Sequence, residues 1–197
     1  MFGAKRIPQL TRAHWIADTS EPVLETTLGD ALRTAAATFG DRLALIEGNG
    51  TSGRRWTYAA LLSDCERAAY ALAQRFSPGE RVAIFAANCP EWVMVEFGAA
   101  LAGLTLVTVN PAFLPKEVAY VLGQSKASGV IVQNQYRGRD LCAVVEEVRA
   151  ELPTLREILP LDDWADLISA APVCPLPSVS PFDIAQIQYT SGTVWVR

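Results

Sequence analysis

Residues 82–109 read VAIFAANCPEWVMVEFGAALAGLTLVTV, and this stretch decides the fold class. The apolar run at 82–85 is typical of a buried strand, and so is the run at 104–109. Between the two, Pro90 occupies a favoured first-turn position of a helix that continues to Leu101. Continuous apolar strands that alternate with helices predict a parallel sheet covered on both faces.

The same alternation extends in both directions along the chain. Thr27 is placed to begin a helix that stops near Gly40, and Thr57 is placed to cap a long helix that reaches Phe76. A buried strand is expected at 43–46. The other expected elements are a turn at 49–50, strands at 54–57, 130–132 and 184–189, and helices at 115–122 and 141–152. We therefore predict an α/β fold, a mainly parallel sheet flanked by helices.

The domain organisation is expected to be simple. Residues 1–26 show no sustained periodicity and predict an irregular arm, whereas residues 27–197 carry the strands and helices of one domain. Residues 160–182 contain five prolines and only weak periodicity, which predicts a surface connection before the last strand.

Composition excludes several classes of function. The net charge is −4 with no basic stripe, so a nucleic-acid partner is not expected. The four cysteines lie far apart without a CxxC pair, which argues against a metal site and a disulfide framework and predicts free thiols in a reducing compartment. The longest apolar stretch, 98–109, contains Gly103 and two threonines and is too short to span a bilayer. We expect a cytoplasmic protein without a transmembrane segment.

The candidate binding residues follow the last expected strand. Thr190, Ser191, Gly192 and Thr193 provide hydroxyl groups that can donate to phosphate oxygens, and a glycine that lets backbone amides approach an anion closely. Doubly wound folds present their ligands at this position, beyond the carboxyl end of a strand. Taken alone, the same tetrapeptide is also typical of a plain turn.

The segment Tyr189-Thr190-Ser191-Gly192-Thr193 resembles the opening of the ATP-phosphate loop of adenylate-forming enzymes, Tyr-Thr-Ser-Gly-Thr-(Thr/Ser)-Gly-x-Pro-Lys-Gly. Other stretches are similar to that family in the same order: 56–61, 79–84, 88–92, 102–111, Glu117 with Leu122 and Ser125, and 183–188. The likeness covers roughly residues 27–193, which is far more specific than any single motif. The chain is identified as a member of the AMP-binding family and is most similar to its fatty-acid type acyl-CoA synthetases.

This resemblance implies a two-step reaction. A carboxylate, such as a fatty acid, attacks the α-phosphate of Mg²⁺-bound ATP to give an acyl-adenylate and pyrophosphate, and the thiol of coenzyme A then displaces AMP. Because charge develops on phosphate oxygens, catalysis depends on positioning and electrostatic stabilisation. The resemblance thus implies ATP, Mg²⁺ and CoA as cofactors, with residues 190–193 as part of the phosphate loop.

The chain departs from the family pattern after Thr193. Val194, Trp195, Val196 and Arg197 follow where the family has Thr or Ser, Gly, a variable residue and Pro, so the second glycine of the loop and the lysine after the proline are absent from this sequence. The family's acyl pocket, Mg²⁺-binding glutamate and ribose-binding aspartate are all expected further downstream. We therefore expect a truncated N-terminal AMP-binding domain that contains no catalytic residue, binds ATP weakly and is inactive alone, with apolar surface that favours self-association. The alternatives are a non-catalytic binding module and an unrelated nucleotide-binding domain.

The last four residues also predict a frameshift. Val194-Trp195-Val196 is encoded by GTN TGG GTN, and a shift of one nucleotide allows Ser and Gly, followed by Phe if the Arg197 codon begins with C. That order resembles the family's (Thr/Ser)-Gly-x continuation. An unrelated tail is the alternative.

Overall fold

The computed structural model describes residues 19–20, 23–48 and 53–190. Two 3₁₀ turns occur at Arg149–Glu151 and Leu161–Asp163. In chain order the helices and strands of these residues are α1 (Leu28–Phe39), β1 (Leu43–Ile46), β2 (Arg55–Thr57), α2 (Tyr58–Ala73), β3 (Arg81–Phe85), α3 (Pro90–Leu101), β4 (Thr105–Val109), α4 (Pro115–Ser125), β5 (Gly129–Val132), β6 (Gln135–Tyr136), β7 (Arg139–Asp140), α5 (Leu141–Val148), β8 (Glu157–Pro160), α6 (Trp164–Ala170) and β9 (Gln186–Gln188).

The main sheet has five strands in the order β8-β5-β3-β4-β9, and every neighbouring pair is parallel. Strand β3 is central: Ala83 is in register with Val107 of β4 on one side and with Val130 of β5 on the other. The expected α/β fold with a mainly parallel sheet is confirmed.

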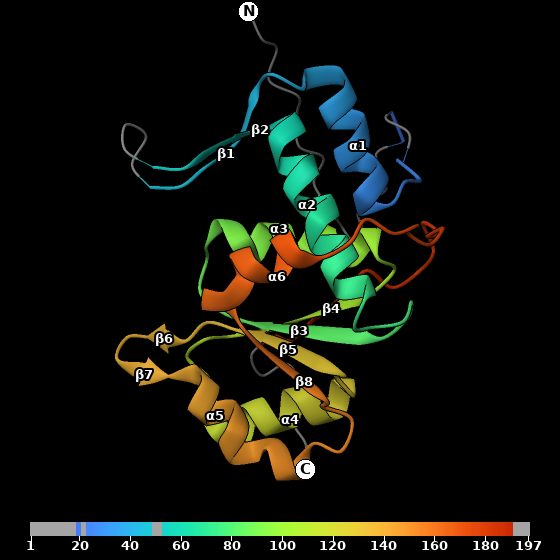
Figure 1. The fold of residues 1–197 in the computed structure, drawn as a ribbon. Coiled ribbons are helices and arrows are strands. Elements are labelled where there is room, and N and C mark those ends of the chain that lie inside the picture. Colours follow the sequence, from blue (N-terminus) through green and yellow to red (C-terminus); the bar gives the residue numbers. More distant parts are fainter. Residues whose placement is uncertain (1–18, 21–22, 49–52, 191–197) are drawn as a thin grey trace, which may run out of the picture.

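The two faces of the sheet are covered by different helices. Figure 1 shows α3 and α6 on one side of the sheet, with α2 and α1 stacked beyond, and α4 and α5 on the other side. Strand β3 serves both layers, because consecutive residues of a strand point to opposite faces. Val82 and Ile84 belong to the core on the α2–α3 side, and Ala83 and Phe85 belong to the core on the α4–α5 side. All four side chains are fully buried.

The first two long helices begin as the sequence predicts. The Thr27 hydroxyl accepts a hydrogen bond from the Asp30 amide (3.0 Å), and the Thr57 hydroxyl accepts one from the Ala60 amide (3.2 Å). Each bond satisfies a helix N–H that lacks a backbone partner. Helix α2 packs closely on α3 at Gly98, where an added Cβ would lie 2.7 Å from the Cβ of Ala68.

The first strand differs from its prediction. We expected a buried strand at 43–46, whereas β1 pairs only with β2, in an antiparallel hairpin that projects from the body in Figure 1. Leu43 and Ile46 are exposed on it. Four apolar residues in a row do not distinguish a core strand from a hairpin strand, so the sequence pattern could not decide between them. The turn predicted at 49–50 lies outside the described residues.

The segment at 160–182 contains more structure than a surface connection. Pro160 ends β8, the outermost strand on one side of the sheet, where a missing N–H costs no ladder bond. Helix α6 follows and buries Trp164 and Ile168 against the core. The short β6–β7 hairpin was likewise not predicted, because two-residue strands leave no periodic signal.

An ion pair fastens the sheet near the amino ends of its strands. The Arg156 guanidinium donates to both carboxylate oxygens of Glu80 (2.7 Å each), and the Glu80 carboxylate also accepts from the Ser128 hydroxyl and the Ser77 amide (2.7 Å each). These donors, Arg156 first among them, lower the pKa of Glu80 from its ordinary 4.5 to about 2. The network joins the residues before β3, β5 and β8.

We predict that Glu80→Gln lowers the free energy of unfolding at pH 7 by about 1 kcal/mol, because a neutral amide cannot form the charged pair and the site is partly solvated. A carboxylate whose pKa is depressed by folding stabilises the folded state above its unfolded pKa, and loses this contribution as the pH falls from about 4.5 towards 2. The difference between Glu80→Gln and the parent should therefore shrink over that range. Urea unfolding at several pH values measures this difference in the free energy of unfolding.

Glu146→Gln is the matched control, because Glu146 forms an exposed ion pair with Arg149 one helical turn away and no other ion pair among the described residues. A loss of stability that is equal in the two variants, or that does not change between pH 7 and pH 3, would contradict the prediction.

Candidate active site

The path of the chain creates a crevice at one edge of the sheet. From β3 the chain passes through α3 to β4, and from β4 it passes through α4 to β5 on the opposite side of β3. The order of strands thus reverses at β3, whose neighbours β4 and β5 lie on its two opposite sides. In open parallel sheets, ligands bind beyond the carboxyl ends of the strands at such a reversal.

A cavity of about 820 Å³ lies at this reversal. It is lined by residues just after β3, at the end of β4 and just after β9. The first turns of α3 and α4 complete the lining. Its aromatic wall contains Trp92, Phe113, Tyr120 and Tyr189, and Lys116 contributes a cationic group. A cavity of this size, with apolar walls and a few polar groups, is typical of a small-molecule site.

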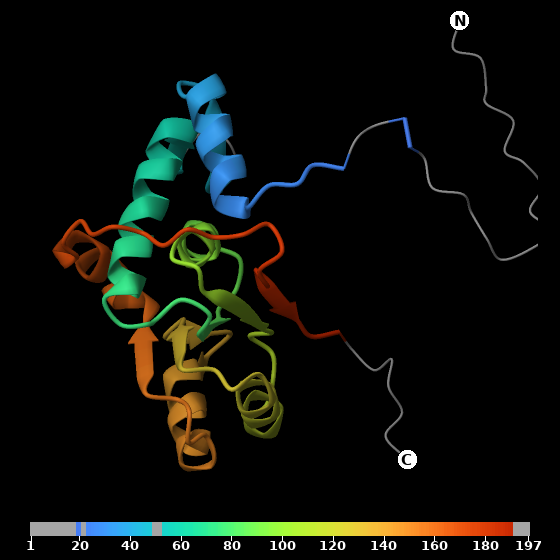
Figure 2. The ribbon, with the colours of Figure 1, turned by 90° about the vertical axis from the view of Figure 1, so that its right-hand side faces the viewer.

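Strand β9 brings Thr190, the first residue of the predicted phosphate-binding segment, to this cavity. The strand lies beside β4, with Thr108 in register with Gln188, and Figure 2 shows it in dark red at the outer edge of the sheet. Two threonines of β4 hold it there. The Thr105 hydroxyl donates to the Ile184 carbonyl (2.9 Å), and the Thr108 hydroxyl donates to the Gln188 side-chain oxygen (2.8 Å).

Thr190 follows β9, is exposed, and lines the cavity. Of the four predicted binding residues, the structure therefore places Thr190 at the crevice. Ser191, Gly192 and Thr193 lie outside the described residues.

Tyr189 anchors the chain just before Thr190. Its hydroxyl donates to the Val121 carbonyl of α4 (3.3 Å). Its ring packs edge-on against the Tyr120 ring, and the two ring centroids are 6.3 Å apart. Burial raises the pKa of Tyr189, so the phenol remains protonated and able to donate. The end of β9 is thus fixed to helix α4 as well as to β4.

The loop between β4 and α4 forms another wall of the cavity, and the sequence did not reveal how it is held. Within the loop, the Asn110 side-chain oxygen accepts a hydrogen bond from the Ala112 amide (2.9 Å). From outside, the Arg139 guanidinium donates to the carbonyls of Ala112 (3.2 Å) and Phe113 (2.9 Å). Arg139 belongs to the β6–β7 hairpin, whose tight turn places Arg137 and Gly138 at positive φ. Arg139 was missed because its partners are backbone carbonyls 26 and 27 positions away.

Other polar residues near the crevice have structural partners. The Glu91 carboxylate accepts from Arg54 of the β1–β2 hairpin, and the Glu117 side chain accepts from the Leu114 amide at the start of α4 (2.8 Å). Asn88, which follows β3, lines the cavity. Within the described part of the chain, no group of three His, Cys, Asp or Glu residues is arranged to hold a metal.

The cysteines are free, as predicted. Cys65 is fully buried on α2, and burial raises the pKa of its thiol to about 12. A thiol with so high a pKa remains protonated at neutral pH and is a poor nucleophile or metal ligand.

Comparison with known proteins agrees with this geometry. The sequence profile described as "AMP-binding enzyme" matches residues 32–194. The chain belongs to the AMP-binding enzyme family. The predicted resemblance is confirmed by relatives and solved structures that are acyl-CoA ligases and synthetases.

Three members of the AMP-binding family illustrate the match. The mitochondrial medium-chain acyl-CoA ligase ACSF2 of Danio rerio is 30% identical over 149 residues, 75% of this chain and 24% of the relative. The crotonobetaine/carnitine–CoA ligase of Salmonella enteritidis PT4 is 33% identical over 175 residues, 80% of this chain and 32% of the relative. The structure of Mycobacterium tuberculosis fatty acyl CoA synthetase superposes with a TM-score of 0.73 at 26% identity, covering 84% of this chain and 32% of that one.

The chain thus spans about a quarter to a third of the length of these AMP-binding enzymes. Among the residues that the structure describes, no helix has both the length and the apolar character needed to cross a membrane.

We predict that Arg139→Ala loosens the cavity wall without unfolding the domain. Loss of two charged hydrogen bonds to backbone carbonyls should speed hydrogen exchange at the amides of Ala112, Phe113 and Leu114 by about tenfold, while the global unfolding midpoint changes little. Exchange monitored by mass spectrometry or NMR measures this. Arg137→Ala on the same hairpin is the control, because the Arg137 guanidinium lies over the Tyr136 ring, whereas Arg139 donates the two hydrogen bonds to the loop. Equal exchange in both variants would show that Arg139 does not hold the loop.

Proposed function

We propose that this chain forms the phosphate-binding edge of an ATP-dependent acyl-CoA synthetase. The proposed reaction converts a carboxylate, ATP and CoA into acyl-CoA, AMP and pyrophosphate. One observation carries the proposal: β9 extends the parallel sheet beside β4 and delivers Thr190 to the crevice where the strand order reverses. Family membership supports the reaction class, because the relatives are named as CoA ligases.

The residues at the crevice suit a nucleotide. The hydroxyls of Thr190, Ser191 and Thr193 and the backbone around Gly192 would contact phosphate oxygens. Lys116, exposed at the start of α4, would add positive charge, and the aromatic wall offers flat apolar surface. Mg²⁺ would accompany the phosphates of ATP and neutralise part of their charge. CoA is included because the relatives are CoA ligases.

We further propose that the chain alone does not complete this reaction. The relatives that carry the named activities are three to four times longer than the part that matches. In the described residues the cavity offers Lys116 as its cation, whereas a pentavalent phosphate develops negative charge on several oxygens at once. Catalysis would then require groups beyond those that line this crevice.

The purified chain should therefore release no pyrophosphate from ATP and Mg²⁺ in the presence of a fatty acid such as dodecanoate, above the level of a heat-inactivated sample. Trapping of acyl-adenylate with hydroxylamine should also be negative. Pyrophosphate release that depends on both ATP and the fatty acid would contradict this, and would assign the chain a complete ligase activity.

Calorimetry with ATP provides the companion measurement. Weak binding, in the millimolar range or above, agrees with a partial phosphate site, since about 4 kcal/mol corresponds to millimolar affinity. Micromolar binding that is lost in Ser191→Ala would instead favour the alternative function, a non-catalytic nucleotide-binding module.

We also expect the chain to self-associate near β9. This strand is at the outer edge of the described sheet, and Phe182 and Ile184 just before it are 84% and 67% exposed. An open strand edge beside exposed apolar side chains favours association. Sedimentation velocity should show oligomers that grow with concentration, and fewer of them in the double variant Phe182→Ser, Ile184→Ser.

Val173→Ser is the control for this prediction, because Val173 is similarly exposed (81%) but distant from β9 in sequence. A single monomeric species at all concentrations, without binding of a hydrophobic dye, would contradict the expectation.

A further inference from the structure

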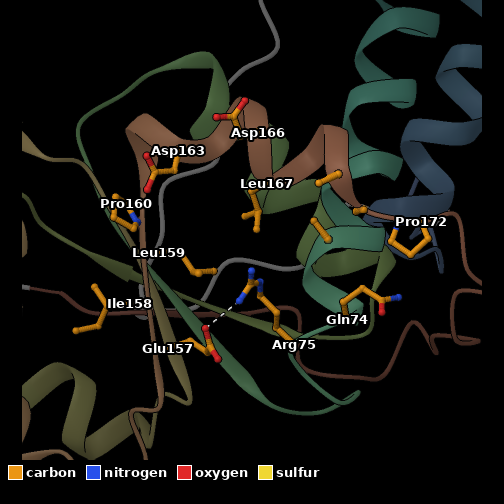
Figure 3. Close-up of a pocket in the computed structure, with 13 residues that line it drawn as sticks. Gln74, Arg75, Glu157, Ile158, Leu159, Pro160, Asp163, Asp166, Leu167 and Pro172 are labelled. Carbon is orange, nitrogen blue, oxygen red and sulfur yellow. Dashed lines mark hydrogen bonds and ion pairs between the residues drawn. The ribbon is translucent and has the colours of Figure 1, made fainter.

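A second cavity, of about 600 Å³, lies along the edge of the sheet that is opposite β9. We call it the β8 cleft. It is bounded by β8, by α6 and by the C-terminal end of α2, and Figure 3 shows these three elements around it. Thr190, the one predicted phosphate-binding residue that the structure describes, does not line it, so the proposed function leaves the cavity unexplained.

The β8 cleft follows the open edge of a strand. All four residues of β8, from Glu157 to Pro160, line it, although consecutive strand residues point to opposite faces. Because residues from both faces of β8 line the cleft, the cleft runs along the edge of the strand rather than over one face of the sheet. In the described sheet β8 pairs with β5 and has no strand on its other side. An open edge of this kind can accept an additional strand, which at β8 would pair with the residues before Pro160, since Pro160 has no N–H to donate.

The floor of the β8 cleft is apolar. Leu159 of β8 and Leu167 of α6 point into it in Figure 3, and Ala71 of α2 adds to the same surface. Leu159 is nearly buried, whereas Leu167 is half-buried and remains accessible from the cleft. This floor has room for an apolar side chain of a bound strand.

The charges around the cleft are unbalanced. At one end, Arg75 and Glu157 neutralise one another in an ion pair of 3.1 Å, drawn as a dashed line in Figure 3. On the α6 side, Asp163 and Asp166 are exposed, and neither carboxylate forms an ion pair within the described part of the chain. Both carboxylates lie at the N-terminal end of α6, where the helix dipole stabilises acidic side chains. Their exposed negative charge beside an apolar floor complements a ligand that carries cations next to apolar groups.

We propose that the β8 cleft binds an extended basic segment of another protein, which adds a strand to the edge of β8. Its backbone pairs with the open edge, one apolar side chain covers Leu159 and Leu167, and a flanking lysine or arginine lies beside Asp163 and Asp166. This use of a sheet edge gives affinity through the backbone and specificity through alternate side chains. The site is independent of the proposed ligase chemistry.

A second copy of the chain fits this site less well. The long irregular stretch at 171–185 contains four prolines, Asp183 and no lysine or arginine, and residues 19–27 contain no lysine or arginine either. Neither stretch supplies the cations that Asp163 and Asp166 require. Lys5, Arg6 and Arg12 belong to residues 1–18, outside the described part of the chain, so a variant without these residues distinguishes the chain's own cations from those of a different protein.

A fluorescent synthetic peptide with the sequence Lys-Val-Lys-Leu-Lys-Val, blocked at both ends, tests the proposal. Fluorescence anisotropy should show saturable binding to the chain, weakened at least about tenfold in the double variant Asp163→Asn, Asp166→Asn. Asp162→Asn is the matched control, because Asp162 is an equally exposed acid of the same turn that does not line the cleft. It should bind as the parent does.

Two further measurements separate strand addition from simple charge attraction. A peptide of the same sequence with N-methylated backbone amides should bind at least about tenfold more weakly, since it cannot pair with an open strand edge. Peptide binding should also slow hydrogen exchange at the Ile158 amide.

The proposal is overturned if the N-methylated peptide binds equally well, or if Asp162→Asn weakens binding as much as the double variant. It is also overturned if a variant without residues 1–18 gains affinity for the peptide by more than about tenfold, because the cleft would then be a site for the chain's own N-terminal segment.

Discussion

Strand β3 is buried on both faces, and the rest of the architecture depends on that constraint. The side chains of Val82 to Phe85 have no accessible surface, and burying a side chain such as valine or isoleucine contributes about 1.5–3 kcal/mol. Two apolar faces require two layers of helices. Parallel neighbours on both sides require crossover connections, which supply those helices. The reversal of strand order beside β3 follows from the two crossovers leaving in opposite directions.

The crevice inherits its properties from this arrangement. Because all described strands of the main sheet are parallel, their carboxyl ends meet at one edge, and the loops after β3, β4 and β9 converge there. The loop after β4 and the segment after β9 are fixed by contacts with other elements. Tyr189 fastens the end of β9 to α4, Arg139 holds the loop after β4, and Glu117 caps the helix that follows it. Thr190 is thereby presented on a fixed framework, as a site for a charged ligand requires.

The sequence predicted the parts of the fold that rest on local patterns. Helix α3 was predicted with its observed bounds, since Pro90 marks its start and an apolar strand follows its end. The burial of β1 was predicted incorrectly, and α6 was missed although Trp164, Leu167 and Ile168 have helical spacing within seven residues. The position of Thr190 followed from motif and topology. The contribution of Arg139 did not, because it depends on a contact between distant segments that no local pattern encodes.

The proposed function requires a phosphate-bearing ligand to bind at the carboxyl ends of β3, β4 and β9. The most direct measurement is an NMR titration of the isotope-labelled chain with ATP at millimolar concentration. The account predicts that the amide signals of Asn88, Asn110, Tyr189 and Thr190 move with ATP concentration, while those of β8 do not. If the shifts instead gather around the β8 cleft, or if no signal near the ends of β3, β4 and β9 responds, the assignment of the crevice as the nucleotide site is contradicted.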